Sequence, residues 1–343
     1  MAERSTIEWT DATWNIVTGC TLVSEGCRNC YAATLAAGRL KHHWSRQGLA
    51  RFNASGEAKF TGEVRLNEPW LDQPLRWSRG RMIFVCAHGD LFHEAVPIHW
   101  LDRIFAVMAL AKHHTFQVLT KRPERARAYL DDHGRLSAIA TSAARHQGWA
   151  RETMSFEWPL PNVWLGTSVE NQATADARIP HLLETPAAVR FISAEPLLGP
   201  VHLSPHLYPK RWGASGPGMR VESVTPALDW IIVGGESGQG ARPMHVDWVR
   251  SLRDQCLGAG TRFLFKQWGD WLPAEIFETD GQGGLTRSQA PAGDPWSGAA
   301  SHWWEGDTFG GFASLHVGKR NSGRLLDGRE WNEMPRGLHR TAA

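Results

Sequence analysis

Apolar, β-rich runs recur along this chain, and most of them end in small or polar residues and lead into a helix-like stretch. Strands that alternate with helices pair in parallel through right-handed crossovers. The sequence therefore predicts an α/β fold, a partial or complete (β/α) barrel of six to seven parallel strands with insertions and a C-terminal accessory segment. The predicted strands lie at residues 13–18, 81–86, 115–119, 162–165, 188–192, 229–233 and 262–265, and helical spacing predicts helices at 98–112, 124–131 and 247–257.

The same rhythm predicts how the chain is divided. We expect residues 1–270 to form the barrel, with insertions at 35–80, 132–160 and 204–227 that are polar or rich in Pro, Gly and small residues. The alternation of strands and helices stops after that, so residues 271–343 are predicted to be the accessory segment.

Polar side chains follow the predicted strands directly. In a (β/α) barrel the carboxyl ends of all strands meet at one mouth, so residues far apart in the chain should face one cavity. The residues placed there are a cysteine-rich loop, Asp90, Lys121, Ser168, Glu170, Glu195, Glu236 and Lys266.

Three of the five cysteines, Cys20, Cys27 and Cys30, fall within eleven residues after the first predicted strand, and Tyr31 follows them. Thiolates this close repel one another unless a metal neutralises them. A structural zinc site needs four protein ligands, whereas a [4Fe–4S] cluster held by three cysteines leaves one iron open for a small molecule. Three unconnected thiols in a reducing cytosol are the alternative, and a disulfide would leave one thiol over.

Composition restricts the partners and the compartment. With 42% hydrophobic and 21% charged residues, the 343-residue chain is typical of a globular protein, and we expect no membrane partner and a cytoplasmic location. A net charge of +2 is too small to indicate nucleic-acid binding by itself. Basic stretches at 39–46 and 319–329 leave such binding open beside the simpler interpretation as solvated surface.

With these motifs in view, the chain resembles radical S-adenosylmethionine (SAM) proteins, in which C-x3-C-x2-C is followed by an aromatic residue. Here the first gap is six residues. The chain is also similar to a set of phage- and prophage-associated proteins of unknown function, and more distantly to the spore photoproduct lyase group, which repairs DNA. The motifs that carry the resemblance, besides the cysteine loop, are IEWTDATWN at 7–15, LTKRP at 119–123, GTSVEN at 166–171, AEPLLG at 194–199, GGESG at 234–238, FKQWG at 265–269 and LLDG at 325–328.

The resemblance implies a specific chemistry. Cys20, Cys27 and Cys30 would each bind one iron of a [4Fe–4S] cluster, and the fourth iron would take the amino and carboxylate groups of SAM. An electron donor would then reduce the cluster, and a 5′-deoxyadenosyl radical would abstract hydrogen from a substrate. A nucleic-acid base is among the substrates that the resemblance implies, for repair or modification. The protein would supply position and exclusion of water.

Several residues that follow strands are candidates for holding SAM. A glycine pair lets backbone N–H groups approach a carboxylate or ribose of SAM. Polar side chains can hold a ribose hydroxyl or the methionine amino group. Each candidate also has a structural alternative: core packing, a tight turn, or capping of the next helix. The candidates are Tyr31, Asp90, Ser168, Glu170, Gly234, Gly235 and Glu236.

Glu195, Lys121 and Cys86 are the candidate catalytic residues. A carboxylate at a barrel mouth is costly without a partner, and Lys121, Arg122 or Lys266 could pair with Glu195. Cys86 ends a strand and could donate hydrogen to a product radical, although a cysteine in an apolar strand usually belongs to the core.

Two other interpretations remain open at this stage. The chain could be a non-catalytic, zinc-stabilised module that binds nucleic acid or a phage protein, with the three cysteines and a histidine or carboxylate closing the site. It could also be a barrel-shaped binding module with vestigial cysteines. His88, Asp90 and His93 raise the separate idea of a second metal site, against ordinary hydrogen bonding at a strand end.

Overall fold

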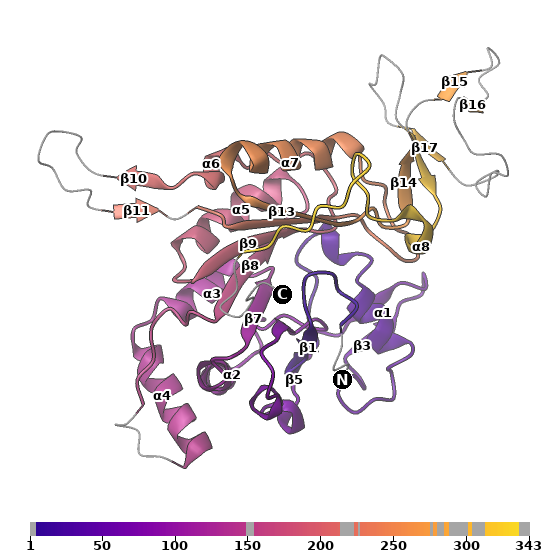
Figure 1. Ribbon diagram of the computed structural model, residues 1–343. Helices are drawn as coiled ribbons and strands as arrows, with labels where there is room; N and C mark the ends of the chain where they lie inside the picture. The colour runs from indigo at the N-terminus through magenta and orange to yellow at the C-terminus, as the bar shows by residue number, and fades with distance from the viewer. Residues whose placement is uncertain are drawn as a thin grey trace, which may run out of the picture.

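In the computed structural model, a single parallel sheet organises the chain (Figure 1). The structure describes residues 5–148, 154–212, 223–225, 227–274, 277–279, 285–287, 301–303 and 313–335. The sheet has seven strands whose spatial order is their order in the chain, and every neighbouring pair is parallel. The strands are β1 (Ala12–Trp14), β6 (Met82–Val85), β7 (Thr115–Thr120), β8 (Val163–Ser168), β9 (Val189–Ala194), β12 (Trp230–Gly234) and β13 (Arg262–Gln267).

The sheet is a partial barrel. β1 and β13 lie at its two edges and do not pair with each other. The predicted α/β fold with a partial barrel is therefore confirmed. The first predicted strand differs in detail, because it is interrupted after β1. The following strand, β2 (Val17–Thr18), leaves the main sheet and pairs antiparallel with β5 (Arg65–Leu66) in a separate small sheet.

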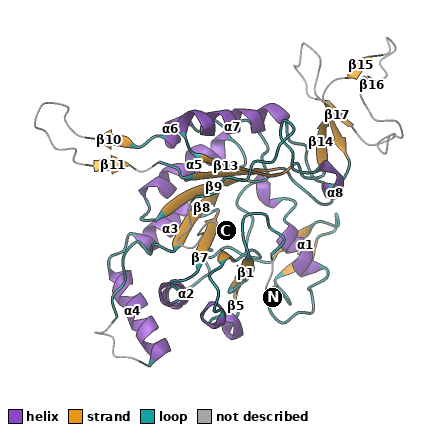
Figure 2. Ribbon diagram, viewed as in Figure 1, coloured by secondary structure: helices purple, strands orange, loops and turns teal. Residues whose placement is uncertain are grey.

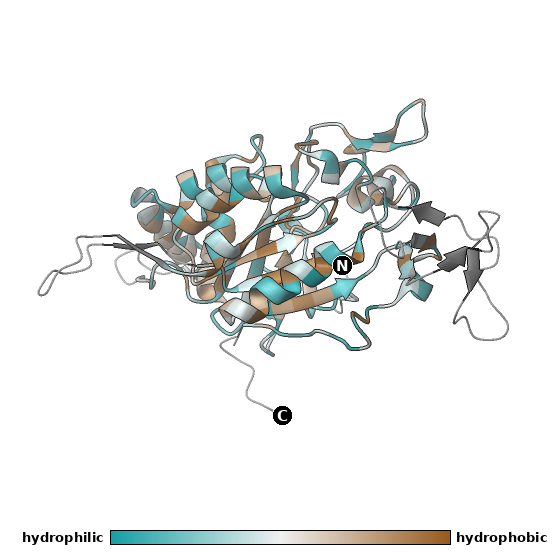
Figure 3. Ribbon diagram, turned by 90° about the horizontal axis from the view of Figure 1, so that it is seen from above, coloured by the Kyte–Doolittle hydropathy of each residue, from teal (hydrophilic) through white to brown (hydrophobic). Residues whose placement is uncertain are grey.

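Helices follow the strands on the outer side of the sheet (Figures 1 and 2). They carry both hydrophobic and hydrophilic residues, as expected for elements with one buried face (Figure 3). In α2, for example, Leu101, Ile104, Phe105 and Met108 are all buried in the core between sheet and helices. The helices of this layer are α2 (Ile98–Leu110), α3 (Pro123–Leu130), α4 (Gly134–Gln147), α5 (Gln172–Glu184), α6 (Ser204–Leu207) and α7 (Val246–Ala259).

The inner side of the sheet is closed by an aromatic floor. Trp9 lies at its centre, with ring centroids 4.7 Å from Phe84, 6.3 Å from Phe191 and 6.1 Å from Trp230. Gly166 makes room for this packing, since a Cβ there would lie 2.5 Å from the Phe191 ring. The floor fills the amino-terminal part of the barrel interior, so polar residues are left to the carboxyl end of the strands.

The segment predicted as an insertion at 35–80 consists of short elements beside β1. α1 (Tyr31–Ala37) packs against the antiparallel pair β3 (Ala50–Phe52) and β4 (Ala58–Phe60) through Ala33, Ala37 and Ala58. Two 3-10 turns, Glu68–Trp70 and Pro74–Arg76, lead back to β6. The predicted insertion at 132–160 contains α4, and the one at 204–227 contains α6 and the pair β10 (Lys210–Trp212) and β11 (Ser223–Thr225); residues 149–153, 213–222 and 226 lie outside the described part.

The chain after β13 forms a three-stranded antiparallel sheet of β14 (Trp271–Ala274), β18 (Ala313–His316) and β17 (Ser301–Trp303), and a separate pair, β15 (Phe277–Thr279) with β16 (Leu285–Arg287). After α8 (Lys319–Ser322) it returns to the barrel. There the Phe265 N–H donates to the Trp331 carbonyl (3.0 Å) and the Glu333 N–H to the Phe263 carbonyl (3.2 Å). This return covers the free edge of β13. The domain boundary predicted at 270/271 stays a prediction.

No helix in the described ranges is both long and apolar enough to cross a bilayer.

Candidate active site at the mouth of the partial barrel

The cysteine loop, residues 19–30, lies across the carboxyl ends of several strands. The Arg122 guanidinium, after β7, donates to the Thr21 hydroxyl (2.6 Å). The Ser24 hydroxyl donates to Glu170, after β8 (2.8 Å), and the Asn29 amide to Glu236, after β12 (3.1 Å). The Asn29–Glu236 hydrogen bond alone joins residues 207 positions apart, so the structure brings distant parts of the chain to one mouth.

Gly19 fixes the start of the cysteine loop. Its φ of +95° is in the left-handed region, and a Cβ there would lie 2.0 Å from the Glu63 carbonyl oxygen. No residue with a side chain fits without moving the backbone, so the turn that delivers Cys20 to the mouth requires glycine.

The three cysteines of the loop are free, half-buried thiols. Cys20 Sγ lies 3.6 Å from Arg122 Nη1, Cys27 Sγ lies 3.9 Å from the Ser24 hydroxyl, and Cys30 is the N-cap residue of α1. Burial, with a smaller effect of the Asp90 charge, raises the pKa of Cys20 to about 12, and burial also raises the pKa of Cys30. Both thiols therefore stay protonated at neutral pH unless a cation binds them.

Across the residues that the structure describes, no three His, Cys, Asp or Glu side chains are grouped as ligands of one metal ion. This holds for the cysteine loop, for a four-ligand zinc set and for His88, Asp90 and His93. The thiols nevertheless fit an iron–sulfur cluster by donor chemistry, because three sulfur ligands lie on one loop whose side chains are hydrogen-bonded to residues that follow three strands. Binding a cluster requires the thiols to turn toward a common centre.

Asp90 and Arg122 form a buried hub beneath the loop. Asp90 Oδ1 accepts from the Thr120 hydroxyl (2.7 Å) and the Phe92 N–H (3.0 Å), and Oδ2 accepts from the Lys121 N–H (3.0 Å) and Arg122 Nη1 (3.0 Å). Both carboxylate oxygens are thus engaged within the protein. As placed here, Asp90 anchors the β7 loop and the guanidinium that touches Cys20.

Glu170 is fully buried and surrounded by donors. It accepts from Lys121 Nζ, from Arg178 Nη1 (2.9 Å) and from the Ser24 hydroxyl (2.8 Å). Burial acts to raise the pKa of Glu170, but Lys121 and Arg178 outweigh it and hold the pKa below its usual value. Gly26 of the loop packs on this carboxylate, since a Cβ there would lie 2.5 Å from Glu170 Cγ.

The helix-capping alternative for Ser168 and Glu170 is wrong. α5 is capped by Asn171, whose side chain accepts from the Thr174 N–H (3.0 Å). Ser168 ends β8, and its carbonyl accepts from Arg178 Nη1 (2.8 Å).

Glu195 and Lys266 form an ion pair above the aromatic floor, with 2.6 Å between Lys266 Nζ and Glu195 Oε1. Successive side chains of a strand point to opposite faces of the sheet. Glu195 is four positions after Phe191 and Lys266 is two positions after Leu264, so the pair lies on the same face as these two floor residues. Of the three partners predicted for Glu195, Lys266 is the one observed. Gly234 lies between them, and its Cβ would approach Glu195 Cδ to 3.2 Å.

The second glycine, Gly235, permits a close crossing of two chains. A Cβ there would lie 1.9 Å from the Trp268 carbonyl oxygen. Glu236 beyond it is buried and accepts from Arg242 Nε (2.8 Å) and Nη2 (2.7 Å) as well as from Asn29. Burial acts to raise the pKa of Glu236, and these hydrogen bonds hold it below its usual value.

Tyr31 is not a core residue, since 52% of it is exposed. Its hydroxyl donates to the Ala87 carbonyl, and desolvation raises its pKa. The Tyr31 ring is therefore accessible at the surface while its hydroxyl is held by the protein. Cys86, by contrast, is buried in the outer core, which raises the pKa of its thiol to about 12, and has a φ of +59°.

Reasoning from sequence missed the arginines that organise this mouth. Arg178 and Arg242 lie within or before helices, and no spacing rule connects them to Glu170 and Glu236. The one indication in the sequence is that each arginine lies shortly after the glutamate that it contacts. Arg242 is six residues after Glu236, and Arg178 is eight residues after Glu170.

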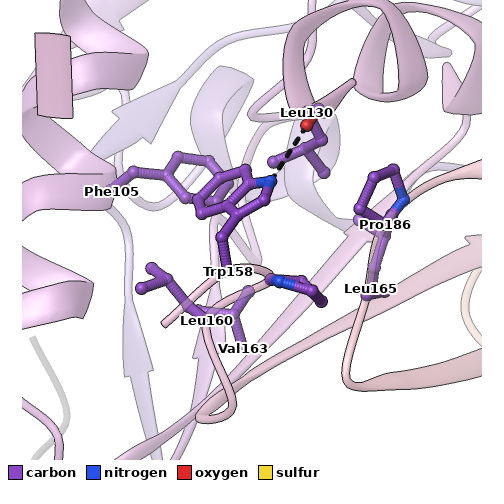
Figure 4. Close-up of a pocket in the computed structure, with 9 residues that line it drawn as sticks. Phe105, Leu130, Trp158, Leu160, Val163, Leu165 and Pro186 are labelled. Carbon is purple, nitrogen blue, oxygen red and sulfur yellow. Dashed lines mark hydrogen bonds between the residues drawn. The ribbon is translucent and has the colours of Figure 1, made fainter. Parts of the chain in front are cut away.

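The apolar hollow in Figure 4 is formed by residues of α2, α3 and β8 and of the segments that precede β8 and β9, and none of the mouth residues described above lines it. It is lined by Phe105, Leu130, Trp158 and Leu165 among others, and the Trp158 indole donates to the Leu130 carbonyl (3.3 Å). Its volume of about 10 Å³ is that of a single water site, so it cannot hold an organic ligand.

The arrangement of the mouth spans most of the chain, and so does a family match: the model of "Protein of unknown function (DUF5131)" matches residues 4–335. The chain belongs to the DUF5131 family. No curated protein and no solved structure matches it. All of the mouth residues described above lie within the matched range of this DUF5131 protein.

Proposed function

We propose that this DUF5131 protein is an iron–sulfur enzyme of the radical SAM type, acting on a substrate bound at the barrel mouth. The observation that carries the proposal is the cysteine loop: three thiols lie on one loop that is hydrogen-bonded across the mouth to the ends of β7, β8 and β12. When bound, a [4Fe–4S] cluster with SAM would supply a 5′-deoxyadenosyl radical that removes hydrogen from the substrate.

Cys20, Cys27 and Cys30 would hold the cluster. The protein prepares the loop for an anionic centre, because Arg122 lies against Cys20 and the charge of Lys121 lowers the pKa of Cys30 against the larger effect of burial. Both cations are held in place by carboxylates, Arg122 by Asp90 and Lys121 by Glu170.

Other mouth residues would hold the organic ligands. Gly234 leaves the end of β12 without a side chain beside Glu195, so in our proposal a ligand approaches the backbone there, whereas Gly235 serves the crossing with Trp268. Tyr31, Ser168, Glu170 and Glu236 border that space in our proposal, and Asp90 supports it from beneath. Since Glu170 and Glu236 are ionised and engaged with arginines, they would act mainly by orienting their neighbours.

The Glu195–Lys266 pair offers one acceptor and one donor toward the substrate. A base edge presents the same combination of donors and acceptors, which supports a nucleic-acid base as substrate. The aromatic floor below excludes water from that side, which protects a reactive intermediate. Lys121 would fix the loop, and Cys86 would have to move out of the outer core to donate a hydrogen atom.

Anaerobic purification followed by reconstitution with iron and sulfide tests this function. We expect about four iron and four sulfide ions per chain, and an electron paramagnetic resonance signal of the reduced cluster that changes when SAM is added. C20A, C27A and C30A should each lose the cluster. C256A, which removes a buried thiol of α7, should keep it.

A well-folded wild-type protein that takes up no cluster after reconstitution would exclude the proposal. Stoichiometric zinc with four protein ligands would instead establish the zinc-stabilised binding module.

A further inference from the structure

One wall of the mouth is strongly basic. Residues 38–66, here called the basic wall, contain six Lys and Arg residues and only two Glu residues, whereas the whole chain of 343 residues has a net charge of +2. Six minus two gives +4 for the wall, so the rest of the chain is net negative. The basic residues of the wall are Arg39, Lys41, Arg46, Arg51, Lys59 and Arg65.

Most of these cations have no carboxylate partner in the described part of the chain. Only Lys59 is paired, with Glu57 at 3.4 Å. Arg39, Lys41 and Arg51 are exposed, and Arg65 donates to the backbone carbonyls of Trp44 and Gln47. Arg51 also lies directly opposite Lys59 in the β3–β4 pair, and like charges placed opposite each other repel.

Arg46 adds a buried positive charge behind this surface. It is only 4% exposed and donates to His88 Nδ1 (3.1 and 2.7 Å) rather than to an acid. Burial, with a smaller effect of the neighbouring Arg65, lowers the pKa of Arg46 to about 10. Burial lowers the pKa of His88 to about 4, so the imidazole is neutral at pH 7. It accepts hydrogen bonds from Arg46 but does not neutralise the charge of the guanidinium.

Exposed aromatic rings lie among the cations. Trp44 is 45% exposed and Phe52 is 50% exposed. Trp44 stacks on His43 with 5.7 Å between ring centroids and 29° between planes, and packs on Trp70 at 4.8 Å. These contacts hold the indole in place while leaving part of it accessible.

The basic wall is joined to the cysteine loop. Lys59 Nζ donates to the Arg28 carbonyl (3.1 Å), and the backbone of Glu63 packs against Gly19. On the other side, Ala58 packs on α1, the helix that Cys30 caps. A molecule bound along the wall therefore lies beside the mouth.

We infer that the basic wall binds single-stranded nucleic acid, with phosphates on its unpaired cations and bases stacked on Trp44 and Phe52. Cations interleaved with accessible aromatic rings are the combination that binds single strands, because an unpaired base exposes its face for stacking and a duplex does not. The placement of the wall would deliver a base to the mouth. That last step rests on the proposed function, whereas the binding itself does not require a cluster.

Fluorescence anisotropy of the full chain, without cluster, tests the binding. The probes are fluorescein-labelled single strands of DNA and of RNA, about 12 nucleotides long, and a DNA duplex of the same length. We expect the single strands to bind more tightly than the duplex, with an affinity that falls as salt rises. The two single-strand probes distinguish DNA from RNA.

Two triple variants separate the wall from net charge. R39Q/K41Q/R51Q should weaken single-strand binding by about tenfold or more and flatten the plot of log K against log salt by about two units, since each phosphate contact contributes roughly 0.7. R79Q/R145Q/R262Q is the matched control. It removes the same charge from exposed residues outside the wall, two of them preceding β6 and beginning β13, and should bind nearly as the wild type.

F52A tests stacking at an exposed ring and should weaken binding of single strands without changing the salt dependence. Equal loss in the two triple variants, or no binding of any probe by folded wild-type protein, would overturn the inference. Preferred binding of the duplex would overturn it as well. A chain that binds single strands yet takes up no cluster would refute the proposed function and leave the basic wall standing.

Discussion

Glu170 shows how one buried carboxylate organises the mouth. Its side chain is 1% exposed, and it contacts Lys121, Arg178 and the cysteine loop at once. Burying a charge is costly, so the hydrogen bonds from the three donors mainly offset the desolvation penalty of the carboxylate and add little to the net stability of the fold. Removing the carboxylate should therefore matter more than the number of its contacts suggests.

E170Q should lower the free energy of unfolding by about 3 kcal/mol, because it leaves Lys121 and Arg178 without their counter-charge. Urea unfolding followed by circular dichroism measures this. E68Q is the control, since Glu68 pairs with Arg103 at 2.6 Å on the surface and exposed pairs contribute less than about 1 kcal/mol. Similar losses in both variants would contradict the role assigned to Glu170.

The lowered pKa of Glu170 also predicts a pH dependence. The folded chain holds this carboxyl ionised below the unfolded pKa of about 4.3, so its contribution is complete above that pH and is lost as pH falls through the folded pKa. The stability difference between wild type and E170Q should therefore shrink below about pH 4. A difference that stays constant to pH 2.5 would show that the carboxyl pKa is not shifted.

At the scale of elements, the cysteine loop depends on a single backbone position. G19A should destabilise the protein by more than about 2 kcal/mol, because it adds a Cβ clash with the Glu63 carbonyl to the strain of a positive φ. G260A is the matched control: Gly260 has a φ of +68° after α7, but no atom lies within 4 Å of its Cβ position. It should cost about 1 kcal/mol, and thermal unfolding compares the two.

The elements also show what the sequence can predict. Helices were expected at 98–112, 124–131 and 247–257 and are found at Ile98–Leu110, Pro123–Leu130 and Val246–Ala259, because apolar residues recur there at helical spacing. α4 was not predicted: its sequence is rich in small and polar residues, and it is stabilised by burying Ile139 and Ala143 in the outer core beside α2. The stability of α4 therefore comes from tertiary packing and not from a helical pattern that the sequence reveals.

The mouth was predictable only in part for a related reason. Parallel strands place the residues that follow them at one edge, which is why Glu195 and Lys266 could be expected near each other. The partners Arg178 and Arg242 approach from other elements, and only three-dimensional packing determines which arginine meets which glutamate. Alternation along strands carries no information about such pairs.

At the scale of the molecule, an open barrel leaves a free edge at β13, and the residues after α8 cover it. Trp331 is 7% exposed, packs edge-on against Phe263 at 5.8 Å, and donates to the Leu326 carbonyl (3.2 Å). Unpaired strand edges template aggregation, so this cover protects the protein as well as stabilising it.

W331A should lower the free energy of unfolding by about 3–4 kcal/mol and promote association through the β13 edge. Chemical unfolding and light scattering at rising concentration measure the two effects. L325A, at a residue that is 55% exposed in the same segment, is the control and should change neither. Unchanged scattering by W331A would show that the edge is protected by other means.

The position of Trp9 has a consequence for how the chain matures. Its ring is buried against Phe84, Phe191 and Trp230, and the last of these follows Trp9 by more than 200 residues of sequence. At synthesis rates of about 5–20 residues per second, on the order of ten to forty seconds pass between the emergence of this indole and that of its last neighbour. The Trp9 indole thus leaves the ribosome long before its last neighbour and stays unburied until that neighbour is made.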